Sequence, residues 1–164
     1  MNPVLTQQTT ATAGLPKELL SNSAFLLARL GVAFKLRALK EVEGTGYSLY
    51  DYSVLALLGE QPRETQGTIA DALKVDRSQL VGVLDSLEER GLVERRRDPA
   101  DRRRHVVSLT AEGRRNLVRL REVVGRLQEE LLAPLDDAGR EALHALLLDL
   151  ARYHDPGCAP PEFS

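Results

Sequence analysis

The segment from Thr65 to Leu109 constrains the fold most, because its spacing predicts two short helices, a tight turn between them, and then two strands. Thr65 is placed to cap the first helix. Asp76, with Gln79 three residues later, has the spacing of a capping box for the second helix. Gly91 is expected to end that helix as a C-terminal cap residue. The sequence therefore predicts a helix-turn-helix in this part of the chain.

Two extended stretches follow the second helix, at residues 92–97 and 105–109. Apolar side chains alternate between the two faces of the second stretch, as expected of a strand with one buried face. The pair Asp98-Pro99 begins the turn between the stretches, which makes them a β-hairpin. Two helices followed by a hairpin is the element order of a winged helix-turn-helix, in which the hairpin is the wing.

Helical patterns extend on both sides of this segment. Apolar residues recur at helical spacing between Pro16 and Val42 and predict one long helix, and Ser48 with Asp51 has the spacing of a further helix cap. The expected fold class is mainly α with a small β-hairpin wing, a winged helix-turn-helix flanked by N- and C-terminal dimerisation helices. The predicted parts are a flexible N-terminal arm (1–15), an N-terminal dimerisation helix (16–46), the winged helix-turn-helix DNA-binding domain (47–110), C-terminal dimerisation helices (111–154) and a flexible tail (155–164).

Charge predicts which end of the second helix would approach DNA. Its N-terminus carries Arg77, and free backbone N–H groups and the helix dipole attract anions there. Its C-terminal half carries Asp85, Glu88 and Glu89, which would repel phosphates. We therefore expect the N-terminal end to enter the major groove, where the amide of Gln79 suits the N6 and N7 atoms of adenine.

Two arginine triplets mark the wing of a chain whose formal net charge is only -2, and seven arginines and three acidic residues lie between positions 90 and 104. Arg102–Arg104 form the hairpin tip and are predicted to enter the minor groove, where the negative potential favours guanidinium groups. Arg95–Arg97 lie on the first strand and are predicted to contact phosphates and to keep the strand edge soluble. Asp98 and Asp101 are expected to hold the turn and to orient an arginine through a bidentate ion pair. The predicted DNA-binding residues are Thr65, Gln66, Arg77, Ser78, Gln79, Gly82, Arg102, Arg103 and Arg104.

The run from Val75 to Gly113 resembles the core of the MarR (multiple antibiotic resistance regulator) family, and the resemblance in helix order extends over residues 16–153. The most specific elements are L-E-x-R-G-L-V-x-R at Leu87–Arg95, D-x-R at Asp101–Arg103 and L-T-x-x-G at Leu109–Gly113. The resemblance implies a homodimer with interleaved N- and C-terminal helices that binds a pseudo-palindromic operator, is expected to act as a repressor, and is usually released by a small ligand. At the matching wing positions it implies that Arg103 is the minor-groove arginine and Asp101 its partner.

The helix expected after Thr110 carries an apolar stripe in which the spacing alternates between three and four residues. Such a stripe is too apolar to stay exposed beside a domain of this size, so it is expected to form a helical seam. A seam within one chain is an alternative, but the resemblance favours a seam between two subunits. The last helix carries a further stripe at Leu143, Leu146, Leu147 and Leu150. The predicted dimerisation residues are Leu20, Leu27, Leu117, Leu120, Val124, Leu127, Leu131 and Leu147.

Three tyrosines, Tyr47, Tyr50 and Tyr52, cluster at the position where the resemblance implies a ligand crevice, and Phe34 could reach the same region. Aromatic rings with polar tips suit a small aromatic or phenolic effector. Tyrosines at such a junction are as often packing residues, so both interpretations stay open.

Several other kinds of site find no support in the sequence. The three histidines, His105, His144 and His154, are scattered and have no cysteine or acidic partner at metal-ligand spacing, so no metal site and no cofactor are expected. The single Cys158 could sense oxidation but lies in the predicted tail, and the sequence leaves its redox role open. No constellation of nucleophile, base and orienting residue is visible, so no enzymatic activity is expected.

The sequence predicts a cytoplasmic protein, because it shows neither a signal peptide nor a run of about 18 to 20 apolar residues that could cross a membrane. The expected partners are double-stranded DNA, a second copy of the chain and a small effector. The alternative is a winged-helix protein-interaction module without DNA binding, for which Asp85 and Glu89 on the exposed face of the second helix are the supporting features.

Overall fold

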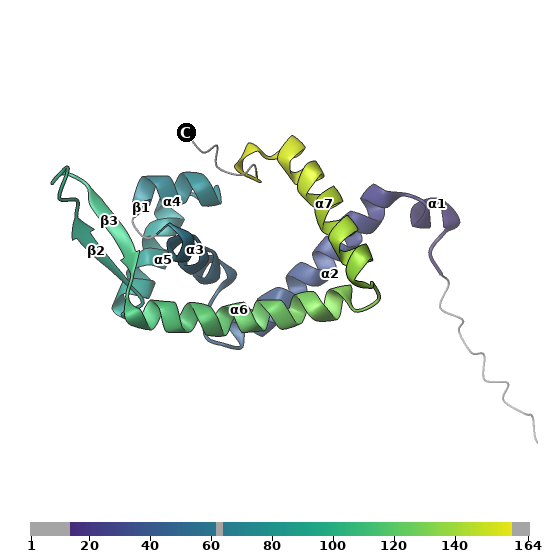
Figure 1. Ribbon diagram of the computed structural model, residues 1–164, viewed down its shortest axis with the longest axis horizontal. Helices are drawn as coiled ribbons and strands as arrows, with labels where there is room; N and C mark the ends of the chain where they lie inside the picture. Colours follow the sequence, from purple (N-terminus) through teal and green to yellow (C-terminus); the bar gives the residue numbers. More distant parts are fainter. Residues whose placement is uncertain (1–13, 62–63, 159–164) are drawn as a thin grey trace, which may run out of the picture. The chain divides into compact units, whose positions relative to one another are not determined.

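The computed structural model describes residues 14–61 and 64–158, so the predicted arm lies almost wholly outside the described residues. The chain divides into two compact units, Met1–Leu36 and Arg37–Ser164. The expected fold class, mainly α with a small antiparallel sheet, is confirmed (Figure 1). The elements are α1 (Lys17–Leu20), α2 (Ser23–Glu43), α3 (Leu49–Glu60), β1 (Glu64–Thr65), α4 (Gln66–Leu73), α5 (Arg77–Glu89), β2 (Val93–Arg97), β3 (His105–Leu109), α6 (Ala111–Leu132), α7 (Asp137–His154) and the 3-10 turn η1 (Pro156–Cys158).

The first unit corrects one prediction, because the single long helix expected from Pro16 is divided into α1 and α2. The division falls at Ser21 and Asn22. The Ser21 hydroxyl donates to the Glu18 carbonyl at 2.9 Å, and the Asn22 side chain accepts from the N–H of Phe25 at 3.0 Å. Serine and asparagine compete in this way with the helical backbone pattern, so a new helix begins here although the apolar spacing continues.

Local side-chain caps fix where the helices of the second unit begin. Ser48 and Asp51 form a reciprocal capping box at α3, with bonds of 2.7 and 3.0 Å, as predicted. Thr65 caps α4 as predicted, and Thr68 completes that box. The tight turn between α4 and α5 is made by Lys74 in a left-handed conformation, with φ of 51°.

The sheet has one strand more than the sequence predicts. β2 and β3 form the predicted hairpin, with Val93 opposite Leu109 and Arg97 opposite His105. β1 adds to the other side of β3, which gives the strand order β1-β3-β2. A strand of two residues is too short to show an alternating pattern, which is why the sequence analysis missed it.

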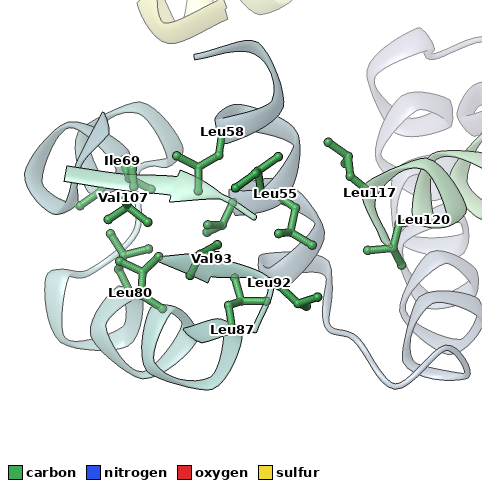
Figure 2. Packing of buried hydrophobic residues seen from close by; sticks show 14 of the residues in the cluster. Leu55, Leu58, Ile69, Leu80, Leu87, Leu92, Val93, Val107, Leu117 and Leu120 are labelled. Carbon is green, nitrogen blue, oxygen red and sulfur yellow. The ribbon is translucent and has the colours of Figure 1, made fainter. Parts of the chain in front are cut away.

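The hydrophobic core lies in the second unit, between the helices of the winged domain and the buried face of the sheet (Figure 2). Each fully buried leucine or valine contributes roughly 1.5–3 kcal/mol to folding. The fully buried side chains are Val42, Val54, Leu55, Leu58, Ile69, Leu80, Leu84, Leu87, Leu92, Val93, Val107 and Leu120.

The apolar stripe of α6 packs mainly within its own chain. Leu117 and Leu120 are 2% and 1% exposed and belong to the core of the winged domain, so the prediction that they face a second subunit is wrong. Val124 also packs against this core, and Leu127 is buried by its own chain. Leu131 stays exposed at the far end of the stripe. The alternative of an intramolecular seam therefore holds for most of the stripe.

Two further elements follow α6 at the C-terminal end of the described chain. Asp136 caps α7, and η1 continues the chain to Cys158. Asp155 forms an ion pair with Lys74, and the Cys158 N–H donates to the Asp155 carbonyl at 2.9 Å. Residues 159–164 lie outside the described residues. No helix in the described part of the chain has the length and apolar character needed to span a membrane.

Candidate nucleic-acid interface

The N-terminus of α5 is held by the carboxylate of Asp76. Its Oδ1 accepts from the N–H groups of Ser78 at 2.8 Å and Gln79 at 3.3 Å, and from the Ser78 hydroxyl. The hydroxyl bond, followed by the two N–H bonds, holds the pKa of Asp76 below its usual value. The cap therefore contributes to stability above the unfolded-state pKa, and this contribution is lost as the pH falls through the folded-state pKa.

The cap confirms only part of the predicted capping box. The cap by Asp76 is present, but no hydrogen bond returns from the Gln79 side chain to the Asp76 N–H. The Gln79 side chain lies at an exposed position, and no described residue forms a hydrogen bond with its amide. The hydroxyl of Ser78, by contrast, already donates to Asp76.

The two faces of α5 separate as predicted. Leu80, Leu84 and Leu87 are buried, whereas Arg77 and Gly82 are exposed. A Cβ added at Gly82 would meet nothing within 4 Å, so the protein's own packing does not require glycine at this position. The outward face of α5 therefore offers a surface that another molecule can approach closely.

The wing loop, residues 98–104, is closed by backbone hydrogen bonds. Asp98 donates its N–H to the Arg104 carbonyl, and Arg104 donates its N–H to the Asp101 carbonyl, each at 2.9 Å. The Asp98 carboxylate accepts from the N–H of Ala100 at 2.9 Å, and that of Asp101 from the N–H of Arg103 at 3.0 Å. The prediction that the two acids hold the turn is confirmed. The predicted bidentate ion pair is wrong, because both carboxylates bind backbone groups instead.

The three arginines of the wing loop are exposed. Within residues 14–61 and 64–158, none of the guanidinium groups of Arg102, Arg103 and Arg104 forms an ion pair. Arg96, two positions before the loop on β2, pairs with Glu94 at 2.8 Å. No described carboxylate therefore contacts these three guanidinium groups, and the three arginines with Asp98 and Asp101 give the wing loop a formal net charge of +1 (three minus two).

The remaining predicted DNA-binding residues lie at the start of α4. The hydroxyl of Thr65 is occupied as the cap acceptor for the Thr68 N–H at 3.2 Å. Gln66, the first residue of α4, is half-buried. The structure therefore gives Thr65 a folding role, whether or not it also contacts DNA.

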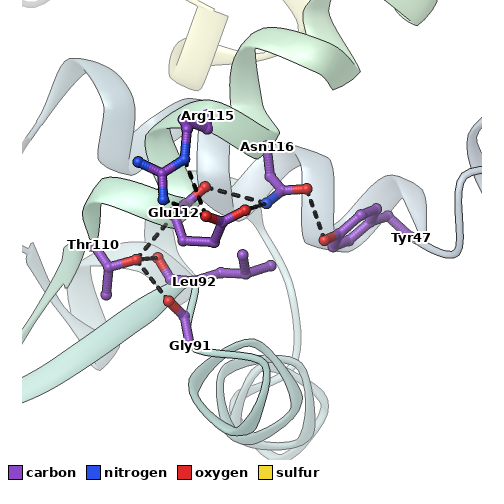
Figure 3. A network of polar contacts seen from close by, with 8 residues as sticks. Tyr47, Gly91, Leu92, Thr110, Glu112, Arg115 and Asn116 are labelled. Atoms are coloured by element: carbon purple, nitrogen blue, oxygen red, sulfur yellow. Dashed lines mark hydrogen bonds and ion pairs between the residues drawn. The ribbon is translucent and has the colours of Figure 1, made fainter.

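The predicted ligand-binding tyrosines have different surroundings. The Tyr47 hydroxyl donates to Asn116 at 2.9 Å (Figure 3). The guanidinium carbon of Arg90 lies 3.8 Å from the centre of the Tyr47 ring. Tyr52 packs against the core, whereas Tyr50 is 47% exposed. Phe34 is half-buried and belongs to the first unit. Only Tyr50 lines the shallow hollow between α3, α4 and α5, which it shares with Leu73, Val75, Gln79 and Val83.

Comparison with known proteins decides the family. The model of the MarR family matches residues 48–105. The putative transcriptional regulatory protein for the hcr operon of Thauera aromatica is 37% identical over 116 residues, which cover 71% of this chain and 69% of that protein. The chain belongs to the MarR family. It is therefore a DNA-binding transcriptional regulator with a winged helix-turn-helix.

Solved structures of MarR-type regulators agree with this fold. The transcriptional repressor CouR bound to a 23-mer DNA duplex is 34% identical, with a TM-score of 0.74 over 85% of this chain and 100% of that chain. CouR from Rhodococcus jostii RHA1 bound to p-coumaroyl-CoA is also 34% identical, with a TM-score of 0.69 over 81% of this chain and 94% of that one.

The structure shows two residues beside Tyr47 that the sequence analysis missed. Arg90 is bonded to the Gly46 carbonyl at 3.0 Å, besides stacking on Tyr47. Asn116 is buried and donates to Glu112, whose pKa is lowered chiefly by its hydrogen bond with Arg115. A signal for Arg90 was present in the motif at 87–95, but spacing alone does not show which surface an arginine contacts.

Proposed function

We propose that this MarR-family regulator binds a pseudo-palindromic operator as a homodimer and represses transcription from it. One observation carries the proposal: the exposed N-terminus of α5 and the exposed arginines of the wing loop belong to the same compact unit. Such a unit suits one half-site, with α5 in the major groove and Arg103 in the adjacent minor groove. Two units would face one side of the duplex at a spacing of roughly 34–36 Å.

The homodimer is supported by apolar side chains that a single chain leaves exposed. Leu146, Leu147 and Leu150 form an exposed stripe on α7, and Leu20 and Leu27 are exposed in the first unit. Exposed apolar stripes of this kind mark interaction surfaces. In the second unit, Leu131 and the three α7 leucines make up the proposed dimer contact, whereas Leu117 and Leu120 are excluded from it. In the first unit, Leu20 and Leu27 are proposed to contact the partner as well.

A small aromatic or phenolic effector is the second part of the proposal. The CouR complex supports it, because the acyl group of p-coumaroyl-CoA is a phenol. The exposed ring of Tyr50 is the best placed of the four candidate aromatic residues. The test adds p-coumaroyl-CoA, or simple phenolic acids, to the preformed complex of protein and DNA. If no compound in this panel releases the DNA, the effector part fails and the DNA part stands.

Arg103→Ala tests the operator proposal directly. Loss of one groove-bound arginine is expected to weaken operator affinity by roughly 10- to 100-fold and to reduce the salt dependence of binding. The measurement is fluorescence anisotropy in a salt series, on a duplex that the wild-type protein recovers from a randomised pool. Arg115→Ala is the control, because Arg115 is also exposed but lies on α6 in an ion pair with Glu112.

The wild-type protein alone separates this proposal from the alternative. A protein that neutralises phosphates loses duplex affinity steeply as salt rises. A winged-helix interaction module would show little duplex affinity at any salt concentration. That result, or an Arg103→Ala variant that binds as tightly as the wild type, would contradict the proposed use of the wing.

Gly82→Ala is expected to separate stability from DNA binding. Alanine in an exposed helix interior stabilises by roughly 0.5–1 kcal/mol relative to glycine, and at Gly82 the added methyl group meets nothing in the protein. The same methyl group would stand between α5 and the floor of the major groove. We therefore expect a higher urea midpoint together with weaker operator binding. Equal operator affinity would show that α5 does not approach the bases at this turn.

A further inference from the structure

Arg95 has a different environment from the other wing arginines. It lies on β2 opposite Val107 of β3, which is fully buried, and only 23% of the Arg95 side chain is exposed. Because side chains alternate along a strand, Arg95 shares the core-facing side of β2 with the buried Val93. The predicted role of Arg95 as a phosphate contact is therefore wrong, since its guanidinium is directed at the protein itself.

The guanidinium of Arg95 joins the wing to α5 through two carboxylates. One terminal nitrogen lies 2.6 Å from Oδ1 of Asp85, and the other lies 3.1 Å from Oε2 of Glu88. The second oxygen of Glu88 accepts from the Arg95 backbone N–H at 3.2 Å. We call Arg95, Asp85 and Glu88 the wing clamp. Its three contacts fix both the side chain and the backbone of β2 to the outer half of α5.

The edge position of β2 gives the backbone contact its importance. In the part of the chain that the structure describes, β2 pairs only with β3, so the N–H groups on its outer edge have no strand partner there. Glu88 occupies one of them. Among the described residues, no hydrogen-bond partner reaches the buried Nε atom of Arg95, so this arginine depends on the two carboxylates for its remaining contacts. The clamp is thus a single unit: loss of the Arg95 guanidinium leaves both carboxylates without their ion pair, and loss of the carboxylates leaves the guanidinium without one.

The clamp gives a structural role to two acidic residues in the C-terminal half of α5. Taken alone, Asp85 and Glu88 would repel the phosphates that Arg77 and the wing loop attract. In the structure both carboxylates are bound to the same guanidinium, which offsets one of their two charges. These acids therefore have a structural use on the DNA-facing side of the molecule.

We propose that Arg95 is a positioning residue for DNA binding, which sets the angle of the wing relative to α5 by holding Asp85 and Glu88. The inference rests on the proposed operator function, since it concerns how the two DNA-contacting elements are aligned. Arg95 itself does not contact DNA. It acts through Arg103. Without the clamp, the wing would present the loop arginines in many orientations, and restricting these orientations on binding would cost conformational entropy and weaken affinity.

Neutral variants on both sides of the clamp give the test. Arg95→Met keeps the apolar stem and removes the charge, and we expect operator affinity to fall roughly tenfold. The double variant Asp85→Asn/Glu88→Gln removes two negative charges that face DNA. If these acids only repel phosphates, this variant binds more tightly than wild type; if they hold the wing, it binds more weakly. The two explanations thus predict opposite changes in the affinity of this variant for the same duplex.

A double-mutant cycle distinguishes positioning from general destabilisation. If Arg95 acts through the wing, Arg95→Met should cost little further affinity once Arg103→Ala has removed the wing contact. A variant that weakens binding only because it is less stable would lose affinity equally in both backgrounds. Additive losses, or tighter binding by the Asp85→Asn/Glu88→Gln variant, would overturn the proposal.

Arg140→Met is the matched control for folding. Arg140 is about as buried as Arg95, at 27% exposed, and also pairs with a carboxylate of another helix, Glu129. Its loss should leave the affinity for an isolated half-site unchanged, and circular dichroism checks that every variant is folded. If Arg95→Met does not fold, the Asp85→Asn/Glu88→Gln variant still tests the proposal, because it shows whether operator affinity falls or rises when the carboxylates are neutralised. Absence of duplex binding by the wild type would defeat the operator function itself, whereas wild-type binding with unaffected clamp variants would defeat only the clamp.

Discussion

Replacing Gly113 with alanine is expected to lower the free energy of unfolding by about 3 kcal/mol, because the site has no room for a methyl group. A Cβ at this position would lie 2.0 Å from the carbonyl oxygen of Leu92 and 3.0 Å from its carbonyl carbon. Both atoms belong to a peptide group that is fixed by a hydrogen bond, since the Leu92 carbonyl accepts from the N–H of Thr110 at 3.0 Å. Neither atom can rotate away as a side-chain tip would, so α6 must move relative to β2.

The helix itself supplies a matched control for this substitution. Gly125 lies on α6 as well, but a Cβ added there meets nothing within 4 Å. Gly125→Ala should therefore stabilise the protein by roughly 0.5–1 kcal/mol through helix propensity alone. Urea unfolding of both variants decides the matter. Similar midpoints for the two would show that the close approach of Gly113 to Leu92 does not constrain the fold.

Gly113 also shows what kind of information the sequence carries. The element L-T-x-x-G is visible in the sequence, and Thr110 is correctly predicted as the cap of α6, with its hydroxyl accepting from the Gly113 N–H at 3.0 Å. A cap joins residues two or three positions apart, so local spacing is enough to find it. The contact of Gly113 with Leu92 joins residues far apart in the chain, and no local pattern indicates it.

The same distinction accounts for the errors at the candidate site. Asp98 and Asp101 were correctly predicted to hold the wing loop, because their hydrogen bonds lie two residues away along the chain. Arg95 was misassigned, because its partners lie on another element and its triplet looks like a uniform basic run. Leu117 and Leu120 have the spacing of an intersubunit seam, yet spacing specifies only which face is apolar and not which surface covers it.

Paired aspartates at Leu146 and Leu150 are expected to convert the regulator from a dimer to a monomer. These side chains are 64% and 51% exposed in the single chain, so charge there costs the protomer little, but it would have to be buried unpaired in the proposed dimer. Sedimentation should show the mass of one chain. The melting temperature should also lose the rise with protein concentration that is expected of the wild-type dimer.

Two comparisons make this prediction specific to the surface of α7. Leu127→Asp is expected to unfold the chain instead, because Leu127 is already buried within it, whereas Val118→Asp, exposed on α6 outside the proposed contact, should leave a folded dimer. A monomer can occupy only one half-site at a time, so the α7 variant should bind the full operator roughly a hundredfold or more weakly. Its affinity for an isolated half-site should be unchanged, because α5 and the wing loop are intact. A dimer that survives both aspartates would place the subunit contact elsewhere, and weaker half-site binding would mean that α7 supports the winged domain directly.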